Sequence, residues 1–341
     1  MRALQLVQPG EFRYIDVDEP TSPGPGQALV RVHRVGICGT DYGGYLGKMP
    51  FYSYPRIPGH ELGVEVVAVG SDVANVKLGD RCSVEPYINC QKCSSCRRGF
   101  TNCCENHQTL GVHCDGGLQR LFLIPARKLH PAPDLTWEQA ALVETLAIGC
   151  HAVHRSGLKA GETALVIGAG PIGLSVIEFT RLTGARTIVM DTNAQRLAFV
   201  REHLGITDTV LATGDGSEGA AIEKLTEGER SHVVVDATGS NLSMSHALNY
   251  CAFAGRLVYV GITQKELSFG HALMHRREIS ILASRNALSP DFPRIIGLIG
   301  AGQIDTRPWL THHATFDDLA AIFPTWMNPT TGVIKAVVEM E

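Results

Sequence analysis

Four cysteines in the first third of the chain have the spacing of metal ligands. Cys90, Cys93, Cys96 and Cys104 follow the pattern CxxCxxCx7C within CQKCSSCRRGFTNCC (90–104). Four thiolates favour zinc in a closed tetrahedral site. An iron–sulfur cluster is the competing interpretation, but ferredoxin patterns continue with a three-residue gap and Cys-Pro. Cys103 is not needed as a ligand, because the regular spacing selects the adjacent Cys104. We therefore predict a structural zinc site, which has no open position for chemistry.

A second group of ligand-type residues is spread over three segments. The stretches GICGTD (36–41), GHELG (59–63) and LVETLA (142–147) contain Cys38, His60, Glu61 and Glu144. A thiolate and an imidazole suit zinc, and either glutamate can complete a site that keeps one position for substrate. Each of these residues alone is more often structural than a ligand. The prediction therefore depends on their occurring together.

The middle of the chain carries a dinucleotide-binding pattern. In ALVIGAGPIGLSV, Gly168, Gly170 and Gly173 follow an apolar run in GxGxxG register and lead into a helical pattern. The first allows a tight turn, the second the approach of a pyrophosphate, and the third close packing of helix on strand. Asp191 ends the next apolar run, where a carboxylate binds the adenosine ribose and favours NAD over NADP. Arg196 would flank the adenosine end and soften this discrimination.

The elements that must position these residues are of two kinds. Stretches 232–239, 255–263 and 279–287 are typical of buried parallel strands, with helices near 218–227 and 241–251, which predicts a doubly wound α/β sheet. Cofactor-binding residues then lie in loops at the carboxyl ends of the strands. The residues expected to contact NAD in these loops are Gly168, Gly170, Pro171, Ile172, Gly173, Asp191, Arg196, Thr238, Gly239, Val260, Gly261 and Ile262. The first third has short alternating runs between Gly, Pro and Asp, which indicate a β-rich, barrel-like domain.

Length and composition limit the function classes. A chain of 341 residues exceeds a usual single domain, so two domains are expected. The net charge of -4 and the lack of a basic stripe argue against a nucleic-acid partner. Glycines interrupt the longest apolar stretches, so no membrane span is expected. The N-terminus lacks a signal-peptide pattern, so the expected location is the cytoplasm, where clustered cysteines indicate metal binding.

Together these motifs resemble those of the medium-chain, zinc-dependent alcohol and polyol dehydrogenase family over nearly the whole chain. The similarity rests on GICGTD, GHE, the four-cysteine run, GVHCDGG, ETLAIGCHAV, GAGPIG and DATG, and PFYSYPRIPGHE, GFTNCCE and ASRNA are similar to the sorbitol and sugar-acid branch. The resemblance implies a GroES-like catalytic domain (1–147) with a zinc lobe (about 82–106), and a Rossmann domain (148–284). It further implies a C-terminal segment (285–341) that returns to the catalytic domain.

The resemblance also implies roles for the ligand candidates. Cys38 and His60 match the two fixed ligands of a catalytic zinc, and Glu144 occupies the position of the third ligand. Glu61 matches an acid that enters or leaves the metal shell. Asp41 matches the carboxylate that orients the ligating histidine.

Proton transfer and substrate contact are implied in the same way. Thr40 matches the hydroxyl that passes on the substrate proton, and Arg285 sits where the polyol branch places an arginine near substrate and cofactor. Many family members end the proton relay with a histidine, and this chain has Gly43 there. The relay is therefore expected to run through Thr40, the cofactor ribose and water, or to recruit Tyr42 or Tyr45.

The implied activity is NAD-dependent oxidation of a secondary alcohol, with one catalytic and one structural zinc per subunit. A sugar acid such as L-galactonate is the first expected substrate and a polyol such as sorbitol the second. A homotetramer or a dimer is expected. The rival classes are a catalytically silent nucleotide-binding sensor or structural protein, which the joint presence of the zinc-ligand candidates disfavours, and a zinc-containing interaction module, which the acidic balance and Asp191 disfavour.

Overall fold

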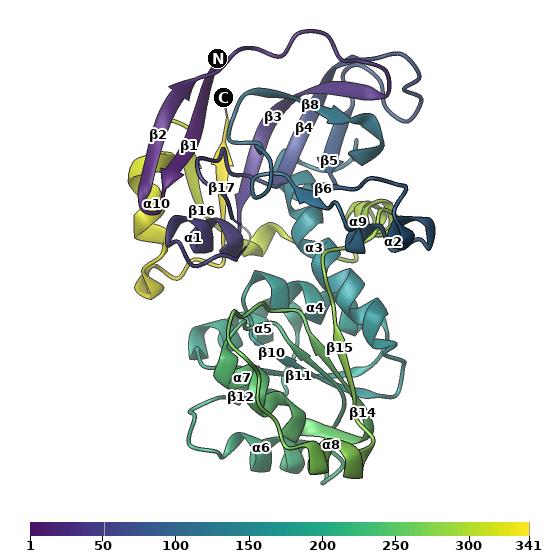
Figure 1. Cartoon of the computed structure of the whole chain (residues 1–341). Helices are drawn as coiled ribbons and strands as arrows, with labels where there is room; N and C mark the ends of the chain where they lie inside the picture. The colour runs from purple at the N-terminus through teal and green to yellow at the C-terminus, as the bar shows by residue number, and fades with distance from the viewer. Residues whose placement is uncertain (51, 341) are drawn as a thin grey trace. The chain divides into compact units, whose positions relative to one another are not determined.

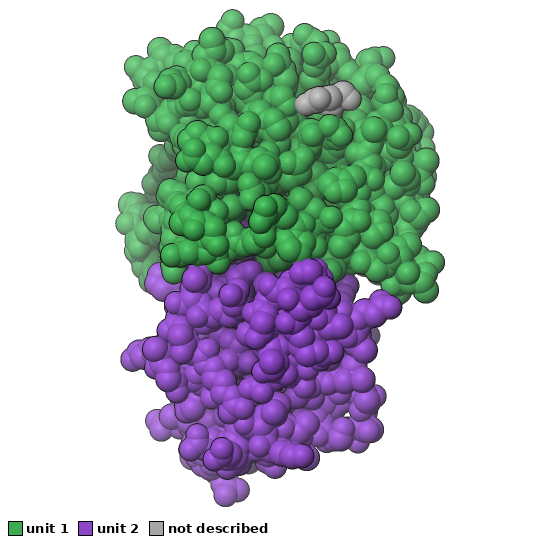
Figure 2. All heavy atoms as spheres, turned by 180° about the vertical axis from the view of Figure 1, so that it is seen from behind, with its two compact units in different colours: residues 1–145, 288–341 green, residues 146–287 purple. Residues whose placement is uncertain are grey.

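The chain folds into two compact units, shown in different colours in Figure 2. The computed structural model describes residues 1–50 and 52–340. Unit 1 contains residues 1–145 and 288–341, and unit 2 contains residues 146–287. These divisions fall a few residues from the domain boundaries expected from sequence, which stay predictions. In the described part of the chain, no helix combines the length and apolar character that a membrane span requires.

Unit 1 is built around the long strand β3 (Gln27–Ile37), whose side chains alternate between buried and partly exposed along most of its length. This alternation is what a strand with one face on a core requires. β3 pairs with three antiparallel neighbours, β4 (Glu61–Val69), β8 (Leu121–Pro125) and β17 (Lys335–Glu339). The C-terminal segment therefore supplies a strand that lies directly beside the N-terminal β3 (Figure 1).

The other elements of unit 1 extend this sheet or lie around it. The sheet has seven strands in the order β16-β17-β3-β4-β5-β9, with β8 on β3. Its remaining strands are β5 (Arg81–Val84), β9 (Leu129–Pro131) and β16 (Leu310–Thr315). Two further hairpins and the helices are β1 (Arg2–Gln8) with β2 (Glu11–Asp16), β6 (Tyr87–Ile88) with β7 (Gln108–Thr109), α1 (Gly39–Tyr45), α2 (Ser94–Arg97), α3 (Trp137–Ser156), α9 (Asp291–Gly300) and α10 (Leu319–Trp326). Helix α3 continues into unit 2.

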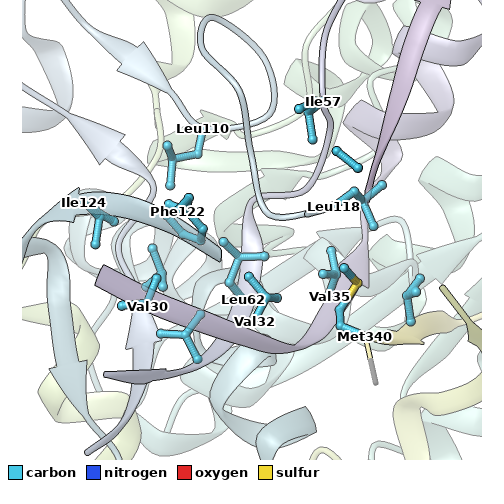
Figure 3. Packing of buried hydrophobic residues seen from close by; sticks show 14 of the residues in the cluster. Val30, Val32, Val35, Ile57, Leu62, Leu110, Leu118, Phe122, Ile124 and Met340 are labelled. Atoms are coloured by element: carbon cyan, nitrogen blue, oxygen red, sulfur yellow. The ribbon is translucent and has the colours of Figure 1, made fainter. Parts of the chain in front are cut away.

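The core of unit 1 is formed by side chains from strands that are far apart in sequence. Val30 and Val32 of β3, Leu62 of β4 and Phe122 of β8 are buried in one cluster, and Met340 joins them from the end of the chain (Figure 3). Burial of one large apolar side chain contributes about 1.5–3 kcal/mol. The β-rich character expected of the first third is confirmed.

Unit 2 is a parallel sheet of six strands in the order β12-β11-β10-β13-β14-β15. This is the strand order 3-2-1-4-5-6 of doubly wound dinucleotide-binding folds, so the predicted fold class is confirmed. The strands are β10 (Thr163–Ile167), β11 (Arg186–Asp191), β12 (Thr209–Leu211), β13 (Ser231–Asp236), β14 (Cys251–Tyr259) and β15 (Ser280–Ala283). The helices are α4 (Pro171–Leu182), α5 (Ala194–Leu204), α6 (Glu218–Leu225), α7 (Asn241–His246) and α8 (His271–Arg277).

Candidate functional site

The four regularly spaced cysteines meet in one cluster in unit 1. The sulfur atoms of Cys90, Cys93, Cys96 and Cys104 all lie within 4.8 Å of one another. Cys103, the surplus cysteine, is exposed and lies outside this cluster. Four converging sulfurs are the donor set of a closed zinc site, so the residues fit the predicted metal.

Local backbone hydrogen bonds lower the pKa of the Cys90 and Cys93 thiols, whereas burial raises the pKa of Cys96. The backbone N–H groups of Cys90 and Asn106 each donate to Cys104 Sγ at 3.3 Å, and the N–H of Cys93 donates to Cys90 Sγ at 3.3 Å. Hydrogen bonds from the backbone of Lys92 and Cys93 lower the pKa of the Cys90 thiol to about 6. Because a metal binds the deprotonated thiol, this arrangement favours metal binding near neutral pH.

A second cluster forms where β3 ends and β4 begins. The two strands pair with Gly36 opposite Glu61, which brings the adjoining Cys38 and His60 together. One ligand atom each of Cys38, His60 and Glu61 lies within 4.8 Å of the other two. Gly36 is required here, because a Cβ at that position would lie 2.1 Å from Glu61 Oε2.

The charge around His60 suits a divalent cation. His60 is buried, and its Nδ1 lies 3.9 Å from Asp41 Oδ1. Neither atom has a hydrogen-bond partner among the described residues. Burial lowers the pKa of His60, but the charges of Asp41 and Cys38 outweigh burial and raise it well above its ordinary value. A buried imidazole in such negative surroundings needs a compensating cation, and a metal supplies it without protonating the ring.

Asp41 also fixes the position of the ligand cysteine. Cys38 precedes helix α1, and its backbone N–H donates to Asp41 Oδ2 at 2.8 Å. The same carboxylate therefore touches the segment of Cys38 and faces His60. Its predicted role of orienting His60 stays a prediction.

Two buried carboxylates complete the cluster, and each has a different partner. Glu61 Oε1 accepts a hydrogen bond from the Nζ of Lys335, which also donates to the carbonyl of Ile37 at 3.1 Å. Glu144 lies in α3, and its Oε1 accepts a hydrogen bond from the Tyr87 hydroxyl. Burial raises the pKa of Glu144. Glu144 is not part of the close group of three ligand atoms, so its role as the third ligand stays a prediction.

Lys335 and Tyr87 are the functional neighbours that the sequence analysis missed. Lys335 is only 1% exposed, although it lies in the otherwise apolar strand KAVVE. A lysine inside such a run was a usable signal of a buried charge. Tyr87 carried no comparable signal.

The residues considered for proton transfer lie on α1. Thr40 is half-buried in its first turn. Tyr42 has a buried hydroxyl without a hydrogen-bond partner among the described residues, and burial together with the charge of Asp41 raises its pKa. Tyr45 instead packs against the ring of Phe12, with ring centroids 5.3 Å apart.

The glycine pattern of unit 2 forms the turn between β10 and α4. Gly168 has φ +96°, which favours glycine. A Cβ at Gly173 would lie 1.7 Å from the Gly168 carbonyl oxygen, so helix and strand approach too closely for another residue. Gly170 caps the helix, and Pro171 and Ile172 form its first turn. The free N–H groups of such a turn bind phosphate.

The carboxylate of Asp191 is held at the end of β11. Its Oδ2 accepts the Ala169 N–H at 2.6 Å, and its Oδ1 accepts the Asn193 N–H at 2.7 Å. The carboxylate is therefore tied to the glycine turn. Arg196 on α5 reaches the same place, since its Nη1 lies 3.4 Å from where a Cβ of Gly170 would be.

The loops after β13 and β14 are tied together by Asp236, another residue whose role the sequence analysis missed although it begins DATG. Its carboxylate accepts the Thr238 N–H at 2.9 Å, and its carbonyl accepts the N–H groups of Val260 at 2.9 Å and Gly261 at 3.2 Å. A Cβ at Gly261 would lie 2.3 Å from the backbone nitrogen of Gly239. These predicted cofactor neighbours therefore lie together.

The last two predicted cofactor neighbours are exposed. Ile262 follows the β14 loop and is 60% exposed, which is unusual for a large apolar residue. Arg285 is exposed just after β15. Both belong to unit 2, and their contact with cofactor stays a prediction.

Comparisons with known protein families match both units. Residues 24–134 match the model of the alcohol dehydrogenase GroES-like domain, and residues 171–301 match the zinc-binding dehydrogenase model. The L-galactonate-5-dehydrogenase of Escherichia coli K12 is 36% identical, over 99% of this chain and 98% of that protein. The 2-dehydro-3-deoxy-L-galactonate 5-dehydrogenase of Pseudoalteromonas atlantica is 32% identical, over 99% of this chain and 98% of that protein.

Solved structures agree with these matches. A structure described as a short chain alcohol dehydrogenase of Escherichia coli CFT073, solved with NADH, has a TM-score of 0.92 and 27% identity, over 100% of this chain and 99% of that one. Fold and site together define a zinc-binding, nicotinamide-dependent dehydrogenase. The chain belongs to the medium-chain zinc-dependent alcohol dehydrogenase family. The enzyme class and the two kinds of cofactor predicted from sequence are thereby confirmed.

Proposed function

We propose that the protein oxidises a secondary hydroxyl group of a sugar acid, in the manner of L-galactonate, and transfers the hydride to NAD. The observation that carries this proposal is the group formed by the partly buried Cys38 and the buried His60 and Glu61, whose ligand atoms lie within 4.8 Å of one another. The sugar-acid substrate is supported by the two relatives that are named for galactonate derivatives.

Cys38 and His60 hold the catalytic zinc in this proposal, with Glu144 as third ligand and Glu61 as the exchanging acid. The bound ion acts as a Lewis acid that lowers the pKa of the substrate hydroxyl. Asp41 keeps His60 oriented. This assignment is supported by the burial of His60, Glu61 and Glu144 and by the partly buried Cys38 beside them.

Thr40 accepts the hydroxyl proton and passes it to solvent. The half-buried position of Thr40, two residues after the ligand Cys38, supports this role. Tyr42 is the second candidate for the relay. Its raised pKa keeps the phenol protonated at neutral pH, so it can donate a proton and accept another in turn.

NAD binds to unit 2 through the glycine turn, with Asp191 on the adenosine ribose. The two backbone hydrogen bonds to Asp191 fix its carboxylate at the strand end, where it would repel a 2′-phosphate. This supports NAD over NADP. Arg196, close to Gly170, is placed to bind the pyrophosphate or the adenosine end of the cofactor.

A neutral polyol is the second candidate substrate. The L-arabinitol 4-dehydrogenase of Aspergillus oryzae is 34% identical over 95% of this chain and 88% of that protein, which favours a polyol substrate.

A homo-oligomer, dimer or tetramer, belongs to the same proposal by family resemblance. So does a cytoplasmic location, which is supported by the finding that none of the ten cysteines, all in the described residues, forms a disulfide.

The test is NADH formation on a panel of aldonates and polyols, with and without a zinc chelator. Chelator-sensitive turnover on aldonates is the expected result, and turnover confined to polyols would move the assignment to the second candidate. Cys38→Ala should abolish turnover and leave NADH binding intact, whereas the exposed Cys103→Ala serves as the matched control. NAD binding without turnover on any substrate would refute the proposal.

A further inference from the structure

A tyrosine beside the four-cysteine cluster reaches a carboxylate of the catalytic cluster. Tyr87 lies in β6 and donates its hydroxyl to Glu144 Oε1. It is 2% exposed, and its ring lies 6.0 Å from that of His107, centroid to centroid. The hydrogen bond uses one carboxylate oxygen of Glu144 and leaves the other for a metal.

The four-cysteine loop begins and ends at the hairpin that carries this tyrosine. In the β6–β7 pair, Tyr87 is opposite Thr109 and Ile88 is opposite Gln108. Cys90 follows β6 by two residues, and Cys104 precedes β7 by four. Joining these two sulfurs through one ion therefore closes the connecting loop next to the β6–β7 strand pair.

Hydrogen bonds connect the closed cysteine loop to strand β7. The Cys90 N–H donates to Cys104 Sγ at 3.3 Å, and the His107 N–H donates to the Cys104 carbonyl at 3.2 Å. His107 Nε2 lies 2.8 Å from the Oγ1 of Thr109, the residue that faces Tyr87. The position of Tyr87 thus depends on contacts that the cysteine cluster holds in place.

The chain on the other side of the hairpin is also anchored. Glu85 forms a buried ion pair with Lys128, and its backbone N–H donates to the Lys128 carbonyl at 2.8 Å. Arg127 donates to the carbonyl of Asn89 at 2.9 Å. Residues 85–90 are therefore held on one side by Arg127 and Lys128, and Tyr87 depends on the closed cysteine loop for its support on the β7 side.

Tyr87 is the donor in this contact, and the carboxylate of Glu144 is its acceptor. A donor on one oxygen of a carboxylate orients the group, as partners of metal ligands commonly do.

We propose that Tyr87 is a positioning residue that couples the four-cysteine lobe to the catalytic metal site through Glu144. Occupancy of the four-cysteine site then sets how tightly the catalytic site holds zinc. This inference rests on the proposed role of Glu144 as a ligand of that zinc.

The first experiment compares zinc retention in the wild type, Tyr87→Phe and Glu144→Gln. Each is dialysed against a graded zinc buffer, and zinc per subunit is measured together with the visible spectrum of the cobalt-substituted protein. Loss of an outer partner lowers metal affinity about 10- to 100-fold, so the catalytic zinc of Tyr87→Phe should dissociate at a correspondingly higher free zinc concentration. Tyr14→Phe is the control, because it also loses hydroxyl hydrogen bonds in unit 1, to the carbonyls of Phe316 and Asp317.

The outcomes separate the inference from the function on which it rests. If Glu144→Gln weakens zinc binding and Tyr87→Phe behaves like Tyr14→Phe, the inference is wrong and the ligand assignment stands. If Glu144→Gln retains zinc and the wild-type cobalt spectrum, the role of Glu144 itself fails.

The second experiment tests the coupling to the cysteine lobe. Cys96→Ser, with the exposed Cys103→Ser as control, should lose zinc from the catalytic site as well as from its own. Adding Tyr87→Phe to Cys96→Ser should cause no further loss of catalytic zinc affinity, since the link is already broken. Independent, additive effects would overturn the proposal. If Cys96→Ser does not fold, stepwise chelation of wild type and Tyr87→Phe answers the same question, because a coupled wild type releases its two ions together.

Discussion

Substitution of Lys335 tests whether the stability of unit 1 depends on this one cation to compensate the buried carboxylate of Glu61. The side chains of Lys335 and Glu61 are 1% and 0% exposed, and they form an ion pair. Burial lowers the pKa of Lys335, but the charges of Glu61 and Cys38 raise it above 10.5 overall, so the lysine is charged at neutral pH. Removing one partner of a buried pair costs about 3–5 kcal/mol, because the other charge is left without compensation.

Lys335→Met should therefore lower the thermal stability of unit 1 substantially. For a unit of about 200 residues each kcal/mol corresponds to about 2–4 °C in Tm, so the expected decrease is about 6–20 °C. The measurement is thermal unfolding of the zinc-loaded protein by circular dichroism. Lys77→Met, at an exposed lysine, should leave Tm nearly unchanged.

A double variant distinguishes a lost charge pair from lost packing. Lys335→Met combined with Glu61→Gln removes both charges, so it should recover part of the stability lost in the single variant. Two results would refute the reasoning: a Tm for Lys335→Met equal to that of Lys77→Met, or a double variant whose loss is the sum of the single losses.

Three further variants address other parts of the molecule. Burial raises the pKa of Glu85, but its partners His130 and Lys128 outweigh burial and lower the pKa below 4.5. The charged Glu85 therefore contributes stability above pH 4.5. This contribution is lost as the pH falls through the lower pKa of the folded state. Glu85→Gln leaves Lys128 buried and unpaired, so the unfolding free energy of this variant in urea should be about 3–5 kcal/mol below that of the wild type at pH 7. The two values should approach each other in acid. An equal difference at both pH values would contradict this reasoning. Asp191→Asn should weaken NAD binding about tenfold, or about 1.4 kcal/mol, and affect NADP less, as measured by calorimetric titration; an unchanged preference for NAD would contradict the assigned role. Gly36→Ala should displace Glu61, because the new Cβ would lie 2.1 Å from Oε2, and zinc content and turnover should both fall, whereas wild-type values would show that the strand pair can shift.

Residues that lie close together in the chain could be read from the sequence. The four cysteines fall within fifteen positions, so their spacing alone determines that one ion can join them. The glycine turn is equally local, because Gly168 and Gly173 meet across a single strand-to-helix connection. The parallel sheet of unit 2 followed from alternating apolar runs and helices, since a parallel sheet buries both of its faces, whereas the order of its strands came from the structure.

The cluster of Cys38, His60, Glu61 and Glu144 was only partly predictable. Cys38, His60 and Glu61 carry chemistry that suits zinc, and the pairing of β3 with β4 brings them together. The sequence leaves the choice between Glu61 and Glu144 open. The structure adds that the two carboxylates differ in their partners, a lysine for one and a phenol for the other.

The sequence by itself determined the ligand types, the glycine turn and the two kinds of fold, because each depends on neighbours within a few turns of chain. Only the tertiary structure decided which groups neutralise and orient the buried carboxylates. Lys335 lies 274 positions from Glu61, and Tyr87 lies 57 positions from Glu144. Periodicity describes which face of an element is buried, but not what the facing element carries. Such contacts arise only when β17 packs beside β3 and the cysteine lobe closes.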